Sequence, residues 1–119
     1  MRVAVVDDDA DVRGLLCAVL GGHAAIEVVG DAPDGAHAAT LADRVRPDVI
    51  VMDFQMPQVN GVEATRRVLA VHPDTEVIGF SSTPASAEAF LAAGARRFFD
   101  KRNVGRLVAY VMARAEAAG

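Results

Sequence analysis

Carboxylates follow two of the apolar runs in this sequence, at the point where each run ends. The segment Asp7-Asp8-Asp9 comes directly after Val3–Val6, and Asp53 comes directly after Val49–Met52. Two carboxylates ~4 Å apart repel by ~4 kcal/mol at an effective dielectric constant of ~20, so such a cluster persists if a cation sits in it. Carboxylate and carbonyl oxygens select Mg²⁺ or Mn²⁺. The sequence therefore predicts a divalent-cation site where these two runs end.

A hydroxyl and an ammonium group follow two further runs. Ser81 comes after Val77–Phe80, and Lys101 comes after Arg96–Asp100. Mg²⁺ is commonly bound alongside phosphate oxygens, and a nearby Lys and Ser can hold further phosphate oxygens. An aspartate is also a competent nucleophile that forms an acyl phosphate. The combined set of side chains predicts phosphoryl transfer to a carboxylate.

The elements that must position these groups alternate along the chain. Five short runs rich in β-branched residues are separated by segments in which apolar residues recur with helical period, such as Val12, Leu15, Leu16, Val19 and Leu20. Strand and helix alternating five times predict a parallel sheet with helices on both faces. The five predicted strands are Val3–Val6, Ile26–Val29, Val49–Met52, Val77–Phe80 and Arg96–Asp100.

The polarity of the runs predicts their places in the sheet. Three runs are apolar throughout and suit central strands, whereas Glu27 interrupts the second run and the fifth is Arg-Arg-Phe-Phe-Asp. Mixed runs belong at sheet edges. The pattern suits an α/β fold with a doubly wound, five-stranded parallel sheet of order 2-1-3-4-5 and five helices, although edge character alone does not fix the order. In such sheets ligands bind at the carboxyl ends of the strands, where the chemical groups above lie.

Composition narrows the class of protein. The chain has 119 residues, 52% hydrophobic and 24% charged, which predicts one globular domain. A net charge of −4 argues against the basic footprint of a nucleic-acid binder. The single cysteine, Cys17, excludes an internal disulfide framework and a multi-cysteine zinc site. The apolar run near the N-terminus is too short for a signal peptide or a membrane span, so the expected location is the cytoplasm.

Four segments in order resemble the receiver domain of bacterial two-component response regulators, over essentially the whole chain. They are Val5–Asp9, Pro47–Gly61, Val77–Ser82 and Ala93–Lys101. The resemblance implies a flavodoxin-like fold and a single receiver domain over residues 1–119, with no output domain in this chain. Glu27–Ala32 and Gly61–Arg67 further resemble receivers of the nitrate-response type, which precede helix-turn-helix output domains.

The resemblance implies a role for each group at the strand ends. Asp53 aligns with the phosphoacceptor, and Lys101 aligns with the lysine that contacts the phosphoryl group. Asp7 and Asp8 align with the acidic pair that organises Mg²⁺, with Asp8 the direct ligand. The backbone carbonyl of Gln55 aligns with a further Mg²⁺ ligand.

Other residues align with the switch that follows phosphorylation. Ser81 aligns with the hydroxyl that turns toward the phosphoryl group, and Phe98 aligns with the aromatic residue that changes rotamer. The side chains of Gln55 and Thr83 fall where receivers tune dephosphorylation. The expected response is an altered face around the fourth helix, fifth strand and fifth helix, reached by population shift between two packings.

The resemblance also implies partners. The phosphoryl group would come from a phosphohistidine on a sensor histidine kinase or phosphotransfer protein, and the altered face would control a downstream protein target. A phosphorylation-dependent homodimer is a further expectation; direct nucleic-acid or membrane binding is not. The chain would not be an enzyme beyond magnesium-dependent self-phosphorylation from a donor and autodephosphorylation.

Two alternative functions belong to other classes. A degenerate receiver would only bind a protein partner, although the complete set of site residues argues against it. A small phosphatase of the haloacid dehalogenase type would act on an external substrate. Asp7 and Asp9 have the required spacing for that chemistry, but Ala10-Asp11 replaces the usual Gly-Thr or Gly-Val and no cap domain is present.

The sequence also predicts local structure at several individual residues. Arg102 stands where the family often has proline after the lysine, so the preceding peptide bond is expected to be trans. Gly79 lies inside a predicted central strand and implies a packing gap or a close approach. Cys17 is expected to pack as a small apolar residue. The three histidines, His23, His37 and His72, are expected at the surface.

Overall fold

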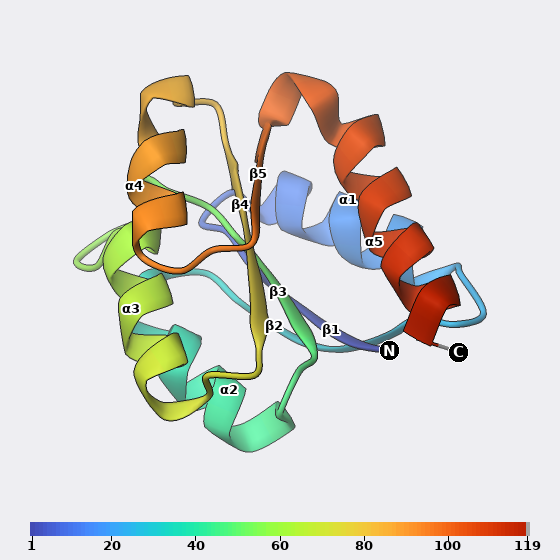
Figure 1. The fold of residues 1–119 in the computed structure, drawn as a ribbon. Helices are drawn as coiled ribbons and strands as arrows, with labels where there is room; N and C mark the ends of the chain where they lie inside the picture. Colours follow the sequence, from blue (N-terminus) through green and yellow to red (C-terminus); the bar gives the residue numbers. More distant parts are fainter. Residues whose placement is uncertain (119) are drawn as a thin grey trace.

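The computed structural model describes residues 1–118 and contains a five-stranded parallel sheet of order β2-β1-β3-β4-β5 (Figure 1). The predicted fold class and strand order are confirmed. The strands are β1 Arg2–Val6, β2 Glu27–Ala32, β3 Val49–Met52, β4 Glu76–Ser81 and β5 Arg97–Asp100. The main helices are α1 Ala10–Gly21, α2 Ala38–Val45, α3 Gly61–Val71, α4 Ala87–Ala92 and α5 Val104–Ala118.

The helices cover both faces of the sheet and divide the core into two clusters. Helices α1 and α5 lie on one face, and α2, α3 and α4 lie on the other (Figure 1). Successive side chains of β1 alternate between the faces, so Val3 and Val5 join the first cluster while Ala4 and Val6 join the second. The strand β3 is buried along its full length. Residues that follow the central strands are therefore fixed on a rigid support.

Two local predictions differ from the structure. The edge strand β2 continues to Ala32, because its last residues pair with Val5 and Val6 of β1 beyond an irregularity in the register. In α1 only Leu16 and Leu20 are buried, whereas Leu15 and Val19 are 55% and 41% exposed. The expected apolar stripe of α1 is thus wider than the surface that the sheet and α5 cover.

The prediction that all three histidines lie at the surface is wrong for His72. Only 11% of its side chain is exposed, and its Nε2 lies 2.6 Å from Asp43 Oδ1, which joins the end of α3 to α2. His23 is partly covered and lies 3.0 Å from Glu116, whereas His37 is exposed. Cys17 is partly buried, as expected, and burial beside Asp31 raises the pKa of its thiol.

The expected trans peptide bond before Arg102 is confirmed, because residues 1–118 contain no cis peptide bond. Within the same residues no helix combines the length and the apolar character that crossing a membrane requires.

Gly79 marks a close approach of two aromatic rings to β4. A Cβ atom on Gly79 would lie 2.8 Å from Phe90 Cγ and 2.9 Å from Phe98 Cδ2. Phe90 is buried in the core cluster on that face and Phe98 packs against that cluster, so an added methyl group would crowd both rings. We expect Gly79→Ala to lower the free energy of unfolding by about 1–3 kcal/mol through overpacking. Urea denaturation measures this change.

Gly105 supplies the matched control for that substitution. A Cβ atom on Gly105 would meet nothing within 4 Å. We therefore expect Gly105→Ala to leave the free energy of unfolding unchanged or slightly raised, because alanine also favours the helix. Equal losses in the two variants would show that ring contacts do not constrain Gly79.

Candidate functional site

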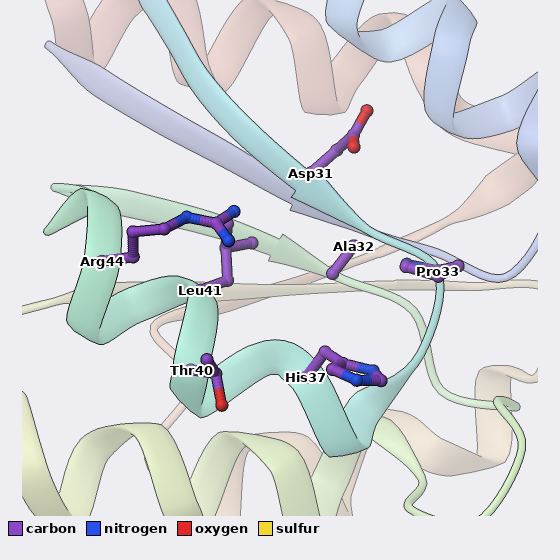
Figure 2. Close-up of a pocket in the computed structure, with 7 residues that line it drawn as sticks. All are labelled: Asp31, Ala32, Pro33, His37, Thr40, Leu41 and Arg44. Atoms are coloured by element: carbon purple, nitrogen blue, oxygen red, sulfur yellow. The ribbon is translucent and has the colours of Figure 1, made fainter.

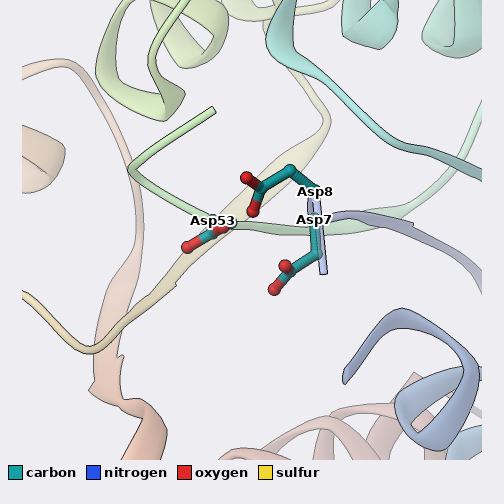
Figure 3. A group of neighbouring side chains, drawn as sticks. All are labelled: Asp7, Asp8 and Asp53. Atoms are coloured by element: carbon teal, nitrogen blue, oxygen red, sulfur yellow. The ribbon is translucent and has the colours of Figure 1, made fainter. Parts of the chain in front are cut away.

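Three carboxylates converge at the carboxyl ends of β1 and β3. One oxygen atom from each of Asp7, Asp8 and Asp53 lies within 4.8 Å of the others (Figure 3). The parallel pairing of β1 with β3 places Val6 opposite Met52, so the residues that follow these strands emerge side by side. The adjacency predicted from the strand ends is confirmed as a geometric arrangement. The three oxygens form a hard-ligand set of the kind that Mg²⁺ prefers.

The three adjacent aspartates at the end of β1 have different environments. Asp7 is buried and its carboxylate accepts a hydrogen bond from the Asp9 backbone N–H at 2.9 Å. Asp9 is the N-cap of α1, because its carboxylate accepts hydrogen bonds from the backbone N–H groups of Asp11 and Val12. Asp8 is exposed and makes no side-chain hydrogen bond or ion pair within residues 1–118. Its carboxylate is therefore available to a ligand.

Lys101 closes the other side of the cluster. It follows β5, and its Nζ lies 2.9 Å from Asp7 Oδ2 and 3.2 Å from Asp53 Oδ1. Burial by itself would lower the pKa of Lys101, but the hydrogen bond to Asp7 and the nearby charges outweigh burial and raise that pKa. The ammonium group stays protonated and compensates part of the negative charge of the buried pair.

Asp53 sits at the centre of the cluster and is 4% exposed. Its backbone N–H donates to the Val6 carbonyl at 2.9 Å, and its Oδ1 accepts from the Phe54 backbone N–H at 2.8 Å. Burial, followed by the charge of Asp7, raises the pKa of Asp53 to about 7 against the opposing effect of Lys101. Without a bound cation the carboxyl group therefore holds a proton up to near-neutral pH.

The turn after Asp53 depends on a second close approach. A Cβ atom on Gly61, the first residue of α3, would lie 1.7 Å from the Asp53 carbonyl oxygen. The Gly61 backbone N–H also donates to the Phe54 carbonyl at 2.8 Å. Only glycine lets the start of α3 return this close to β3, and this contact fixes the loop that carries Gln55.

The raised pKa of Asp53 predicts a pH-dependent stability of the metal-free protein. The native state binds this proton more tightly than the unfolded chain, in which an Asp pKa is ~3.9. The stabilisation is complete below the unfolded pKa and is lost as pH rises toward about 7. We expect the free energy of unfolding to fall by up to about 4 kcal/mol across this window.

Urea denaturation in chelator at several pH values measures this dependence. Asp53→Asn cannot titrate at this position, so its stability should vary less over the same window. A wild-type protein that gains stability with rising pH relative to Asp53→Asn would contradict the assignment.

The other predicted site residues lie around this cluster at different depths. Ser81 is buried at the end of β4, where it pairs with Asp100, and its Oγ accepts from the Thr83 backbone N–H at 3.0 Å. Gln55 is exposed in the loop after Asp53. Phe98 on β5 is partly buried, with its ring centroid 5.8 Å from that of Phe90.

Two side chains with structural roles, Arg13 and Glu76, were not predicted from the sequence. Arg13 Nη1 donates to the Asp7 carbonyl at 2.7 Å and so supports the acidic turn from α1. Glu76 at the start of β4 is buried, and its carboxylate accepts from Tyr110 Oη and from the Arg114 guanidinium. An acid next to an otherwise apolar run was the available signal for Glu76. No local pattern distinguishes Arg13 from other helix residues.

A separate groove of about 250 Å³ lies along β2 and α2 (Figure 2). Its polar groups do not converge, because the Arg44 guanidinium reaches toward the strand while the Thr40 hydroxyl points away from it. The three carboxylates that gather with an ammonium group lie instead at the ends of β1 and β3, with Lys101 beside them. We therefore assign the candidate site to the acidic cluster.

Comparison with known proteins agrees with this geometry. The sequence model of the response regulator receiver domain family matches residues 3–112 of this chain. The receiver domain of Thermotoga maritima CheB superposes with a TM-score of 0.87 at 34% identity, covering 97% of this chain and 95% of that one. The receiver domain of NarL from Mycobacterium tuberculosis superposes with a TM-score of 0.84 at 32% identity, with the same two coverages.

Curated relatives include longer proteins. A protein-glutamate methylesterase/protein-glutamine glutaminase of Rhizobium johnstonii is 38% identical over 92 residues, which cover 77% of this chain and 26% of the relative. The corresponding protein of Anaeromyxobacter dehalogenans is 40% identical over 131 residues, which cover 98% of this chain and 36% of the relative. The chain thus spans about a quarter to a third of the length of these relatives.

Proposed function

The chain belongs to the receiver domain family of two-component response regulators, and from that premise we propose that Asp53 accepts a phosphoryl group from a partner phosphohistidine. The observation that carries this assignment is the convergence of Asp8 and Lys101 on the buried Asp53 carboxylate. Receiver domains are regulatory modules that interact with histidine kinases or phosphotransfer proteins and with downstream effectors.

The environment of the Asp53 carboxylate supports a distinct role for each oxygen. Oδ1 is engaged by the Phe54 backbone N–H and by Lys101, whereas Oδ2 has no hydrogen bond or ion pair within residues 1–118. Oδ2 is thus the oxygen that forms the new O–P bond. The P–N bond of the phosphohistidine breaks, its electron pair stays on the imidazole, and the donor imidazole takes up a proton from solvent.

The charges around Asp53 match the product of this step. The Lys101 ammonium group already contacts Asp53 Oδ1, so it lies close enough to form an ion pair with the oxygens of a phosphoryl group on Asp53. The carboxylates of Asp8 and Asp53, together with the nearby Asp7 carboxylate and the Gln55 carbonyl in the loop, would hold Mg²⁺, and Mn²⁺ would fit the same oxygens. A bound cation of this class supplies electrostatic stabilisation of the phosphoryl charge.

An apolar hollow next to Lys101 supports docking of the donor on α1 and α5. The hollow has a volume of about 310 Å³ and contains the exposed side chains of Leu15, Val19 and Val104. A smaller hollow formed by Val12, Phe80 and other residues links it to Lys101. An apolar helix face of the donor protein would cover this surface while its histidine reaches Asp53.

Two contact routes support transmission of the phosphorylated state. The Ser81 hydroxyl has its own proton to donate toward a phosphoryl oxygen, and Thr83 shares its loop. In parallel, the Phe54 ring beside Asp53 contacts the Phe90 ring, which contacts Phe98 on β5. The proposed response is a shift in the packing of α4, β5 and α5, with Phe98 adjusting its rotamer within a layer that is already partly buried.

The test of this function is phosphoryl uptake by the purified chain. Incubated with Mg²⁺ and a small acyl phosphate donor, the protein should gain one base-labile phosphoryl group in intact-mass spectra. Chelation of the cation should suppress the gain. Absence of uptake with Mg²⁺ would favour the degenerate receiver, and catalytic turnover of a phosphomonoester would favour the phosphatase alternative.

A further inference from the structure

The basic residues of this chain are concentrated near its C-terminal end. Residues 84–114 contain six of the twelve Lys and Arg residues but only two of the sixteen Asp and Glu residues, Glu88 and Asp100. The net charge of the whole chain is nevertheless −4. The molecule is therefore polarised, with an excess of positive charge around β5 and α5 and an excess of negative charge elsewhere.

Part of this charge lies around an aromatic pair. We call Arg97, Phe99, Arg106 and Tyr110 the β5–α5 surface. The rings of Phe99 and Tyr110 are 5.7 Å apart, and Arg97 Cζ lies 5.1 Å from the Tyr110 ring centroid. Arg106 precedes Tyr110 by four residues in α5, so the two share one side of the helix.

The buried Glu76 carboxylate anchors this surface through hydrogen bonds to two residues of α5. Tyr110 Oη donates to Glu76 Oε2 at 2.6 Å, and Arg114 donates twice to Glu76 Oε1, at 2.9 and 3.1 Å. Since Glu76 belongs to β4, these bonds fix α5 on the sheet and set the orientation of the Tyr110 ring. A ring that is already oriented loses little conformational freedom when a partner covers it.

The arginines of this region differ in whether their charge is compensated. Arg114 is paired with Glu76, and Arg102 is paired with Asp100. Arg97 and Arg106 are exposed and make no ion pair within residues 1–118. Two uncompensated guanidinium groups beside an oriented tyrosine form the combination that is enriched at the centres of protein interfaces.

We propose that the β5–α5 surface binds an acidic segment of a different protein, and that it does not form a symmetric dimer. In a two-fold dimer the same patch faces itself, so Arg97 and Arg106 would meet a second copy of the same positive charges. Carboxylates of another protein would instead pair with both guanidinium groups. The acidic remainder of the chain repels nucleic acid, which disfavours that class of partner.

This inference rests on the proposed function, in which the same face responds to phosphorylation, and it adds the chemistry of the downstream partner. Its test uses a fluorescein-labelled peptide of alternating Glu and Leu, with binding followed by fluorescence anisotropy. We expect Arg97→Glu and Arg106→Glu each to weaken binding at least ~5-fold at low salt, and we expect wild-type binding to weaken as salt rises.

Arg44→Glu is the matched control, because Arg44 is also an exposed arginine without an ion pair within residues 1–118, but it lies on α2 near the opposite edge of the sheet. It should change peptide affinity by less than ~2-fold. Circular dichroism checks that each variant is folded. Equal weakening in Arg44→Glu would overturn the proposal, as would an oligo-dT strand that binds as tightly as the peptide.

Light scattering tests the excluded dimer. With beryllofluoride and Mg²⁺ as a phosphoryl mimic, the protein should form no dimer through the β5–α5 surface. A dimer that Arg106→Glu abolishes would overturn the proposal. Peptide binding is measured without the mimic, and phosphoryl uptake is measured separately by mass spectrometry. If the β5–α5 surface binds the peptide while Asp53 takes up no phosphoryl group, the result contradicts the proposed function and leaves the proposed peptide site intact.

Discussion

Asp53→Asn is expected to abolish phosphoryl uptake from a small acyl phosphate donor, with a reduction of at least ~100-fold relative to wild type. The side-chain amide that replaces the Asp53 carboxylate is not a nucleophile for this chemistry, and Lys101 would then contact a neutral group. Intact-mass measurement at a fixed time compares the two proteins directly. The chain contains no tryptophan, so intrinsic tryptophan fluorescence cannot follow the reaction.

Asp48→Asn provides the matched control, since Asp48 immediately precedes the amino end of β3 while Asp53 follows its carboxyl end. The Asp48 carboxylate accepts from the Arg2 backbone N–H at 2.8 Å, which an asparagine oxygen can also do. Asp48→Asn should therefore take up a phosphoryl group at close to the wild-type rate. Uptake by Asp53→Asn at wild-type yield would refute Asp53 as the acceptor.

Asp8→Asn is expected to weaken Mg²⁺ binding at least ~10-fold without lowering the stability of the metal-free protein. Asp8 is exposed and lacks a side-chain partner within residues 1–118, so its carboxylate contributes repulsion toward Asp7 and Asp53 and no compensating contact. Removing the charge should leave the free energy of unfolding unchanged or raise it by about 1 kcal/mol. Calorimetric titration with Mg²⁺ and urea denaturation in chelator measure the two quantities.

The neighbouring Asp9→Asn variant loses the same charge from the same turn. Asparagine also serves as an N-cap, so the hydrogen bonds to the start of α1 are retained. We expect Mg²⁺ affinity in Asp9→Asn to stay within ~3-fold of wild type. If Asp8→Asn instead proved strongly destabilising without metal, its carboxylate would have a structural role.

Much of the site could be predicted from local sequence because the fold is regular. Apolar runs that end in Asp7 and Asp53 identify central strands, and the carboxyl ends of parallel strands share one edge. The same logic predicted that Ser81 would lie at the end of β4 and that Lys101 would follow β5. Edge strands were less well defined, since the end of β2 at Ala32 depends on its pairing with β1. The pairing of two strands depends on both segments, so the sequence of one segment alone does not determine where its strand ends.

Only the tertiary structure decided how charge is distributed in the site. In the sequence Asp7, Asp8 and Asp9 are three similar acids, but the fold buries the first, exposes the second and uses the third to cap α1. The same packing brings Lys101 to within 3.2 Å of Asp53. Burial and Coulomb interactions both depend on distances across the sheet, which local residue patterns do not contain.

The contacts that set Gly61 and Glu76 have the same origin. In the sequence they are a glycine after Asp53 and an acid before an apolar run, which are local features with many structural explanations. The fold makes Gly61 the point where α3 meets the Asp53 carbonyl, and it makes Glu76 the buried partner of Tyr110 and Arg114. The sequence determined which chemistry lies at the strand ends; long-range packing decided which groups are neutralised, which are buried and which remain free to bind.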